Sequence, residues 1–299
     1  MDHLTDKIRD CPTLPALPAV ALRVLELAQR ADATADEIAA AIAADPALAG
    51  RILRTVNSSY YCRGQPVETV AQAVEQLGLH TVRSLVLGYS LADLLAKSCY
   101  SALDGDRHWR RSIYAATAAR VIAHRVDFLH VEEAFLAALL MDIGMLVLDR
   151  VLAHDYAGVL KQVAAHADLP RAEHAALGLT HATAGKILTE RWQLPPLLSI
   201  PIEYHHAPEG TDDATLMRLA QILSLSATCA DVFVTPDPSA AVAGVRALWA
   251  DEFGLGPDDA DALLDEVGRR TVESAALLDI DLPDPADYRA ILSRLAPAA

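Results

Sequence analysis

Residues 134–144, AFLAALLMDIG, decide the fold, because they form a nearly unbroken apolar run that ends at a single aspartate. The run lies inside a helix that we predict from Val131 to about Leu152. A helix that is apolar on most of its sides is expected at the centre of a protein. Asp142 therefore needs a partner, because a lone buried carboxylate is costly.

The composition indicates an acidic, helical protein. Of the 299 residues, 53% are hydrophobic, 56 are alanine and only 5% are aromatic. Alanine favours helices, whereas β-sandwiches draw on β-branched and aromatic residues. With 40 acidic and 25 basic side chains, the net charge of −15 disfavours a broad surface for nucleic acid or for an anionic membrane, because phosphates would be repelled. We therefore expect an all-α protein.

Neither the cysteines nor the N-terminus indicates an exported or membrane-bound protein. The four cysteines are too far apart for a metal-binding or redox CxxC motif. The first residues lack the basic and then apolar pattern of a signal peptide, and no apolar run reaches the ~18 residues of a membrane span. We expect reduced thiols and a cytoplasmic location.

The chain is predicted to have three parts. Residues 1–103 form an N-terminal subdomain of short helices, with a capping box at Thr34 and a helix start at Asp45. Residues 104–235 begin at an Asp-Gly-Asp turn and carry the long helices of a bundle. Residues 236–299 follow a proline-rich break and form an acidic helical extension, which either covers the bundle or mediates dimerisation.

The histidines of the second part are the candidates for chemistry. His181 and the pair His205-His206 occur in the same part of the chain as Asp142. Imidazole and carboxylate groups together suit divalent ions such as Fe, Mn or Zn, and such ions can activate water. A structural role is the plainer alternative for His181. Of the pair His205-His206, we expect one ring to be buried and the other solvated.

An ordered series of short motifs runs through residues 12–235. In chain order the motifs are LPALP at 14–18, DPAL at 45–48, ILRTVNSSYY at 52–61, AVEQLG at 73–78, WRRS at 109–112, LMDIG at 140–144, WQLP at 192–195 and YHH at 204–206. The series resembles the HDOD family, the HD-related output domain of bacterial signalling proteins. LMDIG resembles the HDIG signature of HD-superfamily phosphohydrolases, with Met141 in place of the histidine. The resemblance implies an HD-like helical bundle with an N-terminal helical subdomain.

Departures from the HD pattern argue against catalysis. The resemblance places one metal-binding histidine of HD hydrolases at Arg111, whose guanidinium cannot bind a metal. It places another at Met141, whose thioether suits Mn, Mg or Fe(II) poorly. The late aspartate of the HD enzymes falls near Ala227, with Asp231 one helical turn away as the alternative position.

The HD-like residues that remain are few. They are Asp142, His181, His205 and His206, which are too few for a two-metal centre. We therefore expect no catalytic residue, no metal site and no cofactor, and we predict that the protein is not an enzyme. Arg111 is expected to pair with Asp142 in place of a metal ion.

The resemblance implies a non-catalytic regulatory module that converts an upstream cue into contacts with other signalling proteins. We expect no direct contact with nucleic acid or membrane, and a second copy of the chain is one candidate partner. Asn57, Tyr60 and Tyr61 are the predicted contact surface. Two alternatives stay open. One is a phosphohydrolase or cyclic-nucleotide phosphodiesterase with an atypical single-metal site at Asp142, and the other is a sensor whose vacated metal pocket binds a small anion through Arg111.

Overall fold

The structure confirms the all-α prediction. It is a computed structural model, and it describes residues 2–30, 32–58, 61, 64–96, 101–278, 282 and 288–295. Within these ranges every regular element is an α-helix or a short 3-10 helix.

Spatial contacts group the chain into two compact units. Unit 1 comprises Met1–Leu14, Cys99–Ser274 and Leu282–Ala299, and unit 2 comprises Pro15–Ser98 and Ala275–Asp281. These units are defined by contact alone, and the predicted segments 1–103, 104–235 and 236–299 stay a prediction.

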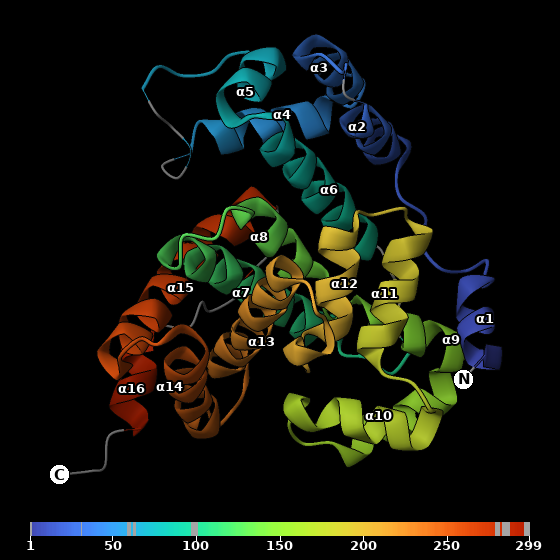
Figure 1. Ribbon diagram of the computed structural model, residues 1–299, viewed down its shortest axis with the longest axis vertical. Coiled ribbons are helices and arrows are strands. Elements are labelled where there is room, and N and C mark those ends of the chain that lie inside the picture. The colour runs from blue at the N-terminus through green and yellow to red at the C-terminus, as the bar shows by residue number, and fades with distance from the viewer. Residues whose placement is uncertain are drawn as a thin grey trace. The chain divides into compact units, whose positions relative to one another are not determined.

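The described part of unit 2 contains four helices of 8 to 11 residues and one of 18, which Figure 1 shows in blue to teal. They are α2 (Ala19–Gln29), α3 (Ala35–Ala43), α4 (Pro46–Val56), α5 (Val70–Leu77) and α6 (Leu79–Ala96). The predicted capping box at Thr34 is present at the start of α3. Asp45 accepts hydrogen bonds from the backbone N–H groups of Ala47 and Leu48, as expected for the residue that caps α4.

The predicted contact surface follows α4. The side-chain amide of Asn57 donates to the carbonyls of Leu53 and Val67 and accepts from the N–H of Val67, over distances of 2.8 to 2.9 Å. Tyr61 is buried, and Tyr60 lies outside the described residues. Asn57 therefore serves unit 2 itself by closing the loop to Val67, and a contact role for Asn57, Tyr60 and Tyr61 stays a prediction.

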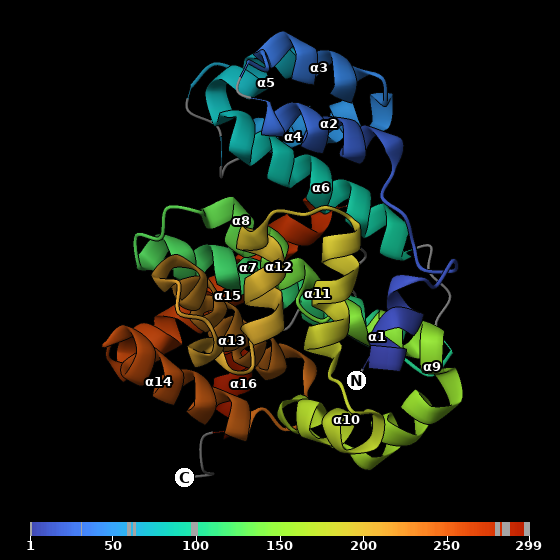
Figure 2. The same cartoon turned by 45° about the vertical axis from the view of Figure 1, so that its right-hand side comes forward.

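Unit 1 is a bundle of longer helices. Its elements are α1 (Asp2–Arg9), α7 (Gly105–Arg125), α8 (Val131–Leu140), α9 (Ile143–Gln162), η1 (His166–Asp168), α10 (Leu169–Leu177), α11 (His181–Arg191), α12 (Pro196–Tyr204), η2 (Pro208–Gly210), α13 (Ala214–Val234), α14 (Ser239–Phe253), α15 (Pro257–Leu277, in this unit as far as Ser274) and α16 (Tyr288–Leu295). Helix α7 packs against α8 and α13, and α11 packs against α9 and α12 (Figure 2). The apolar run from Ala134 to Met141 is buried throughout, as predicted.

The predicted continuous helix from Val131 to about Leu152 is wrong, because the chain breaks at Asp142. The backbone of Asp142 has φ −96° and ψ 9°, and α9 starts at the next residue. The N–H of Met145 donates to the carbonyl of Asp142 at 2.9 Å. The apolar pattern cannot reveal this break, because the residues on both sides of it are buried. The break puts the Asp142 carboxylate at the positive N-terminal end of α9.

Gly144 allows α9 and α11 to approach closely. A Cβ built on Gly144 would lie 1.8 Å from the carbonyl oxygen of His181 and 2.6 Å from the backbone nitrogen of Gly185. A Cβ on Gly185 would in turn lie 3.3 Å from the side chain of Ile143. The first turn of α11, which carries His181, therefore rests against the start of α9 only because residue 144 has no side chain.

Helix α13 is the only helix in the described part of the chain that is long and apolar enough to cross a membrane. Of its apolar window, 61% is buried in the structure, and the helix packs against α7, α8, α12 and α14. A helix buried to this extent and packed against four others belongs to the core of unit 1. The predicted cytoplasmic location stays a prediction.

The substitution Gly144→Ala tests the close approach of α9 and α11. We expect it to lower the free energy of unfolding by about 3 kcal/mol or more, because a methyl group must push two backbones apart. Gly158→Ala is the matched control on the same helix, since nothing lies within 4 Å of its added Cβ. The control should change stability by no more than about 1 kcal/mol, in the stabilising direction. Urea denaturation followed by circular dichroism measures both, and equal stability of the two variants would contradict the close approach.

Candidate metal centre

Four side chains of unit 1, those of Asp142, His181, His205 and His206, place ligand atoms within 4.8 Å of one another, and His166 lies beside Asp142. Asp142 precedes α9, His166 opens η1, His181 opens α11, and His205 and His206 directly follow α12.

The carboxylate oxygen Oδ1 of Asp142 is the centre of this cluster. The Nε2 atoms of three histidines lie 3.3 Å (His166), 3.4 Å (His181) and 3.6 Å (His205) from it. Nε2 of His206 lies 3.0 Å from Nε2 of His181. Ligand atoms that surround one metal ion tetrahedrally at ~2.0–2.2 Å are themselves about 3.3–3.6 Å apart. The distances to Oδ1 are therefore those of ligands around a single ion.

Contacts outside the cluster orient two of the rings. Nδ1 of His181 lies 2.7 Å from the carboxylate of Glu173, and Nδ1 of His205 lies 2.7 Å from the carbonyl of Ile202. Because each Nδ1 faces an acceptor, it carries a proton and Nε2 is the atom presented to the cluster. Metal-binding histidines are commonly held in this way by a carboxylate or a backbone carbonyl.

Glu173 is a fully buried carboxylate with three donors around it. The Tyr156 hydroxyl donates to it at 2.9 Å, and the backbone N–H of His181 donates at 2.7 Å, in addition to the imidazole. Glu173 therefore fixes both the first turn of α11 and the orientation of the His181 ring.

Three atoms at the cluster lack hydrogen bonds within the described part of the chain. Asp142 Oδ1, His166 Nε2 and His205 Nε2 are buried and have no hydrogen-bond partner among the described residues. Leaving a buried polar atom unsatisfied costs ~1–3 kcal/mol, and one bound cation would satisfy all three. Imidazole nitrogens with one carboxylate oxygen suit Zn, Fe, Mn, Co or Ni. The residues present thus fit a metal ion.

The second carboxylate oxygen of Asp142 accepts a hydrogen bond from Arg111, which confirms the predicted pair. Arg111 also donates through Nε to Asp231 at 2.9 Å and through Nη2 to the carbonyl of Ala227 at 3.3 Å. Burial would raise the pKa of Asp142, but Arg111 and then His166 hold it well below its ordinary value. Burial would lower the pKa of Arg111, but Asp142 and Asp231 outweigh burial and raise it. The guanidinium is therefore a fixed positive charge beside the cluster.

The imidazoles differ in charge when no ion is bound. Burial would lower the pKa of His181, but the two carboxylates beside it outweigh burial and raise its pKa to about 9. Burial and the positive charge of Arg111 lower the pKa of His166. Burial and the neighbouring rings lower the pKa of His206. Because a metal ion binds neutral imidazole, His181 must release a proton on binding whereas His166 and His206 are already neutral at pH 7.

A cavity of about 230 Å³ opens beside the cluster. Arg111 and His166 form the part of its wall nearest the cluster. Other residues along the wall are Arg107, His108, Asp231 and the apolar Leu160, Val163 and Leu169. A small molecule in this cavity would therefore contact both the fixed cation and the cluster.

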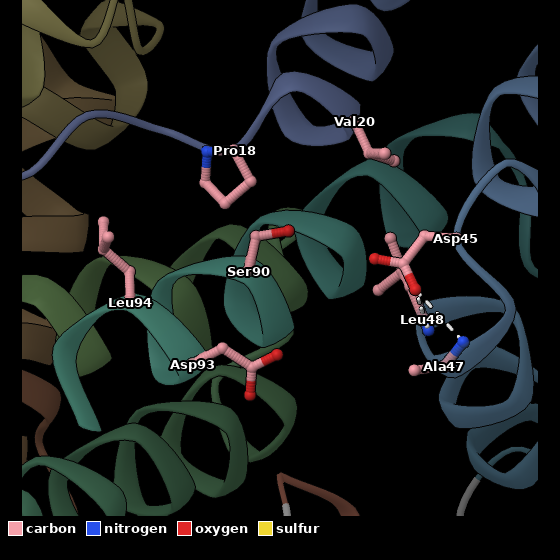
Figure 3. Close-up of a pocket in the computed structure, with 8 residues that line it drawn as sticks. All are labelled: Pro18, Val20, Asp45, Ala47, Leu48, Ser90, Asp93 and Leu94. Atoms are coloured by element: carbon pink, nitrogen blue, oxygen red, sulfur yellow. Dashed lines mark hydrogen bonds between the residues drawn. The ribbon is translucent and has the colours of Figure 1, made fainter. Parts of the chain in front are cut away.

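A second cavity, of about 250 Å³, lies in unit 2 (Figure 3). Figure 3 shows the Asp45 carboxylate directed at the N–H groups of Ala47 and Leu48 at the start of α4. Asp93 pairs with Arg51 at 2.8 Å. Both carboxylates of this cavity therefore have structural partners, and the cluster in unit 1 remains the candidate site.

The structure brings together most of the residues singled out from the sequence. Arg111, Asp142, His181, His205 and His206 meet at the cluster, whereas Met141 packs in the core. His205 is fully buried and His206 is partly exposed, as expected for the pair.

Two residues beside the site are not predicted from the sequence: His166, and Glu173, which is expected to be solvated but is fully buried against His181. His166 stands in no motif, and the separation of eight positions from Glu173 to His181 follows no known ligand spacing. Only the packing of η1 and α10 brings these two residues to Asp142 and His181.

Comparison with protein families identifies the fold. Residues 14–208 match the HDOD domain. The chain belongs to the HDOD family. An uncharacterized protein of Treponema pallidum (strain Nichols) is 24% identical over 215 residues, which are 69% of this chain. The matched part spans 40% of the length of that relative.

Several solved structures share this HDOD fold. An HDOD domain protein of unknown function from Geobacter sulfurreducens has a TM-score of 0.69 at 22% identity, with 93% of this chain and 98% of that chain covered. A protein from Marinobacter aquaeolei VT8, provisionally named a signal transduction protein, has a TM-score of 0.66 at 25% identity, with 93% and 64% covered. A protein from Shewanella amazonensis SB2B, provisionally named a metal-dependent phosphohydrolase, has a TM-score of 0.65 at 22% identity, with 91% and 97% covered. Family membership and the signalling relative fit a regulatory module.

The prediction that the protein is not an enzyme is wrong. It depended on the loss of metal ligands at Arg111 and Met141 and on counting the residues that remained. The structure gathers those residues into a cluster that can hold a metal ion, which removes the reason for excluding metal-dependent catalysis. The count failed because four ligand atoms are enough for one ion, and His166, which occupies no motif position, also lies beside Asp142.

The substitution Arg111→Met tests the buried ion pair. We expect it to lower the free energy of unfolding by ~3–5 kcal/mol, because Asp142 and Asp231 lose their buried cation. Arg125→Met is the control, since Arg125 pairs with Glu266 at 2.9 Å but the two side chains are 28% and 26% exposed. A partly exposed ion pair of this kind should contribute less than about 1 kcal/mol to the free energy of unfolding. Urea denaturation in the presence of EDTA measures both variants, and equal losses would contradict a stabilising role for the Arg111 pair.

Proposed function

We propose that the protein is a regulatory module of signal transduction that binds one divalent transition-metal ion at the Asp142 cluster and acts through contacts with other proteins. The observation that carries the metal site is a set of three buried atoms without hydrogen-bond partners among the residues that the structure describes. Nε2 of His166 and Nε2 of His205 lie 3.3 Å and 3.6 Å from Oδ1 of Asp142. The ion would supply the positive charge that these atoms lack.

One ion fits the site better than two. Arg111 already places a full positive charge on the outer oxygen of Asp142 and on Asp231. A second divalent ion bound between these carboxylates would meet that charge at close range, and like charges a few ångströms apart repel strongly in a buried site. The Arg111 guanidinium therefore already neutralises the carboxylate charge that a second ion would need.

The contact function is supported by the family and by the signalling relative from Marinobacter aquaeolei VT8. The net charge of −15 favours protein partners over nucleic acid or anionic membranes. Other signalling proteins, or a second copy of the chain, are the proposed partners.

A second candidate function is metal-dependent phosphohydrolysis. The observation in its favour is the cavity of about 230 Å³ whose wall includes Arg111 and His166, because it gives a small phosphate ester access to the cluster. The name of the Shewanella amazonensis protein of the same fold points in the same direction.

Metal analysis tests the site. After reconstitution with Zn²⁺ or Mn²⁺ and removal of free metal, mass spectrometry should find about one ion per chain. Asp142→Asn and His205→Ala should abolish binding, because each removes a buried atom of the cluster. The exposed neighbours His154 and Asp155 supply the controls His154→Ala and Asp155→Asn, which should bind as the wild type does. A wild-type chain that stays free of metal would contradict the proposal.

Two assays separate the candidate functions. The metal-loaded chain is first tested for hydrolysis of p-nitrophenyl phosphate and bis(p-nitrophenyl) phosphate, with Asp142→Asn as the inactive control. Partners cross-linked to the loaded and the metal-free chain are then identified, purified and titrated against it. Hydrolysis that disappears in the variant supports the second candidate. The contact function is contradicted if neither the metal-loaded nor the metal-free chain binds a purified partner or a second copy of the chain.

A further inference from the structure

We propose that His166 is itself a ligand of the ion, so that the short η1 segment is part of the metal site. This inference rests on the proposed function, because it concerns the same ion. It adds a residue that no motif assigns and an element, η1 with the following α10, that the ion would tie to the rest of the bundle.

The position of His166 is that of a ligand. Its Nε2 lies 3.3 Å from Asp142 Oδ1, which is the shortest of the three histidine distances to that oxygen. Its ring centroid lies 5.5 Å from that of His181 and 6.0 Å from that of His206. The His166 ring therefore lies beside the His181 and His206 rings, with its Nε2 next to Asp142 Oδ1.

The 3.3 Å contact between His166 and Asp142 does not have the geometry of a well-formed hydrogen bond. Nε2 of His166 and Oδ1 of Asp142 are both buried, yet neither has a hydrogen-bond partner among the described residues. The His166 side chain is 13% exposed and forms part of the wall of the cavity beside the cluster. An ion between these atoms would satisfy both, together with His205 Nε2.

The local sequence explains how His166 reaches the cluster. Ala165 is extended, with φ −110° and ψ 138°, and the single turn of η1 then leads directly into α10. Leu169 is buried and anchors the start of that helix. Seven residues after His166, α10 carries Glu173, which holds the His181 ring. One short segment thus supplies a ligand and also the carboxylate that orients another ligand.

The inference has a mechanical consequence. With an ion bound, residues 163–177 would be joined through His166 to α9, α11 and α12. Without it, η1 is held by its neighbours in α10 and by apolar packing. Metal binding should therefore slow backbone hydrogen exchange in residues 163–169 of the wild type, and this effect requires His166.

The test compares the wild type with His166→Ala and His166→Asn in the full chain, using Zn²⁺ and Co²⁺ as probes. Zn²⁺ affinity is measured by competition with a chromophoric chelator, the Co²⁺ site by its visible absorption spectrum, and residues 163–169 by hydrogen exchange with and without Zn²⁺. His174→Ala is the control, because His174 is an exposed histidine on α10. We expect both His166 variants to bind Zn²⁺ at least about tenfold more weakly, with a changed Co²⁺ spectrum and no Zn²⁺-dependent protection.

The outcomes are distinguishable. If the wild type and the His166 variants bind one ion with equal affinity and the same Co²⁺ spectrum, the inference is overturned and the proposed metal site stands. If the wild type binds no ion, both are overturned. Circular dichroism and the melting temperature of each metal-free variant are measured first, and His166→Asn, which keeps a polar side chain of similar size, decides the question if His166→Ala does not fold.

Discussion

The buried carboxylate of Asp142 is the group on which the arrangement of unit 1 depends. One of its oxygens accepts a hydrogen bond from Arg111 on α7. The other oxygen lies 3.3 to 3.6 Å from the Nε2 atoms of three histidines. A charge at 2% exposure needs compensation from its surroundings. Asp142 has that compensation from a permanent cation on one side and from groups that can bind a cation on the other.

The backbone brings these groups together through two local features. The break between α8 and α9 places Asp142 at a helix start, and Gly144 lets the first turn of α11 rest directly on α9. If the chain continued as one helix through residue 142, the carboxylate would lie on the side of that helix. His181 reaches Asp142 because α11 begins where the missing Cβ of residue 144 leaves room.

The charges of the site also explain its relation to the HD phosphohydrolase pattern. Arg111 is a fixed cation between Asp142 and Asp231, so part of the negative charge available to metal ions is already neutralised. One free carboxylate oxygen and a group of imidazoles remain. Such ligands suit a single transition-metal ion. If Arg111 and Met141 stand where the resemblance places HD histidines, their side chains change the number of ions that the proposed site would hold without removing the remaining ligands.

The sequence by itself determined the helical class, the family, the helix starts at Thr34 and Asp45, and the pairing of Arg111 with Asp142. These features depend on composition, on hydrogen bonds between residues a few positions apart, or on motifs in a fixed order. Only the tertiary structure decided that the apolar run breaks at Asp142 and that His166 and Glu173 join the site. The reason is physical: both depend on which helices pack against one another, and no short-range pattern of apolar residues records that η1 and α10 lie against α9 and α11.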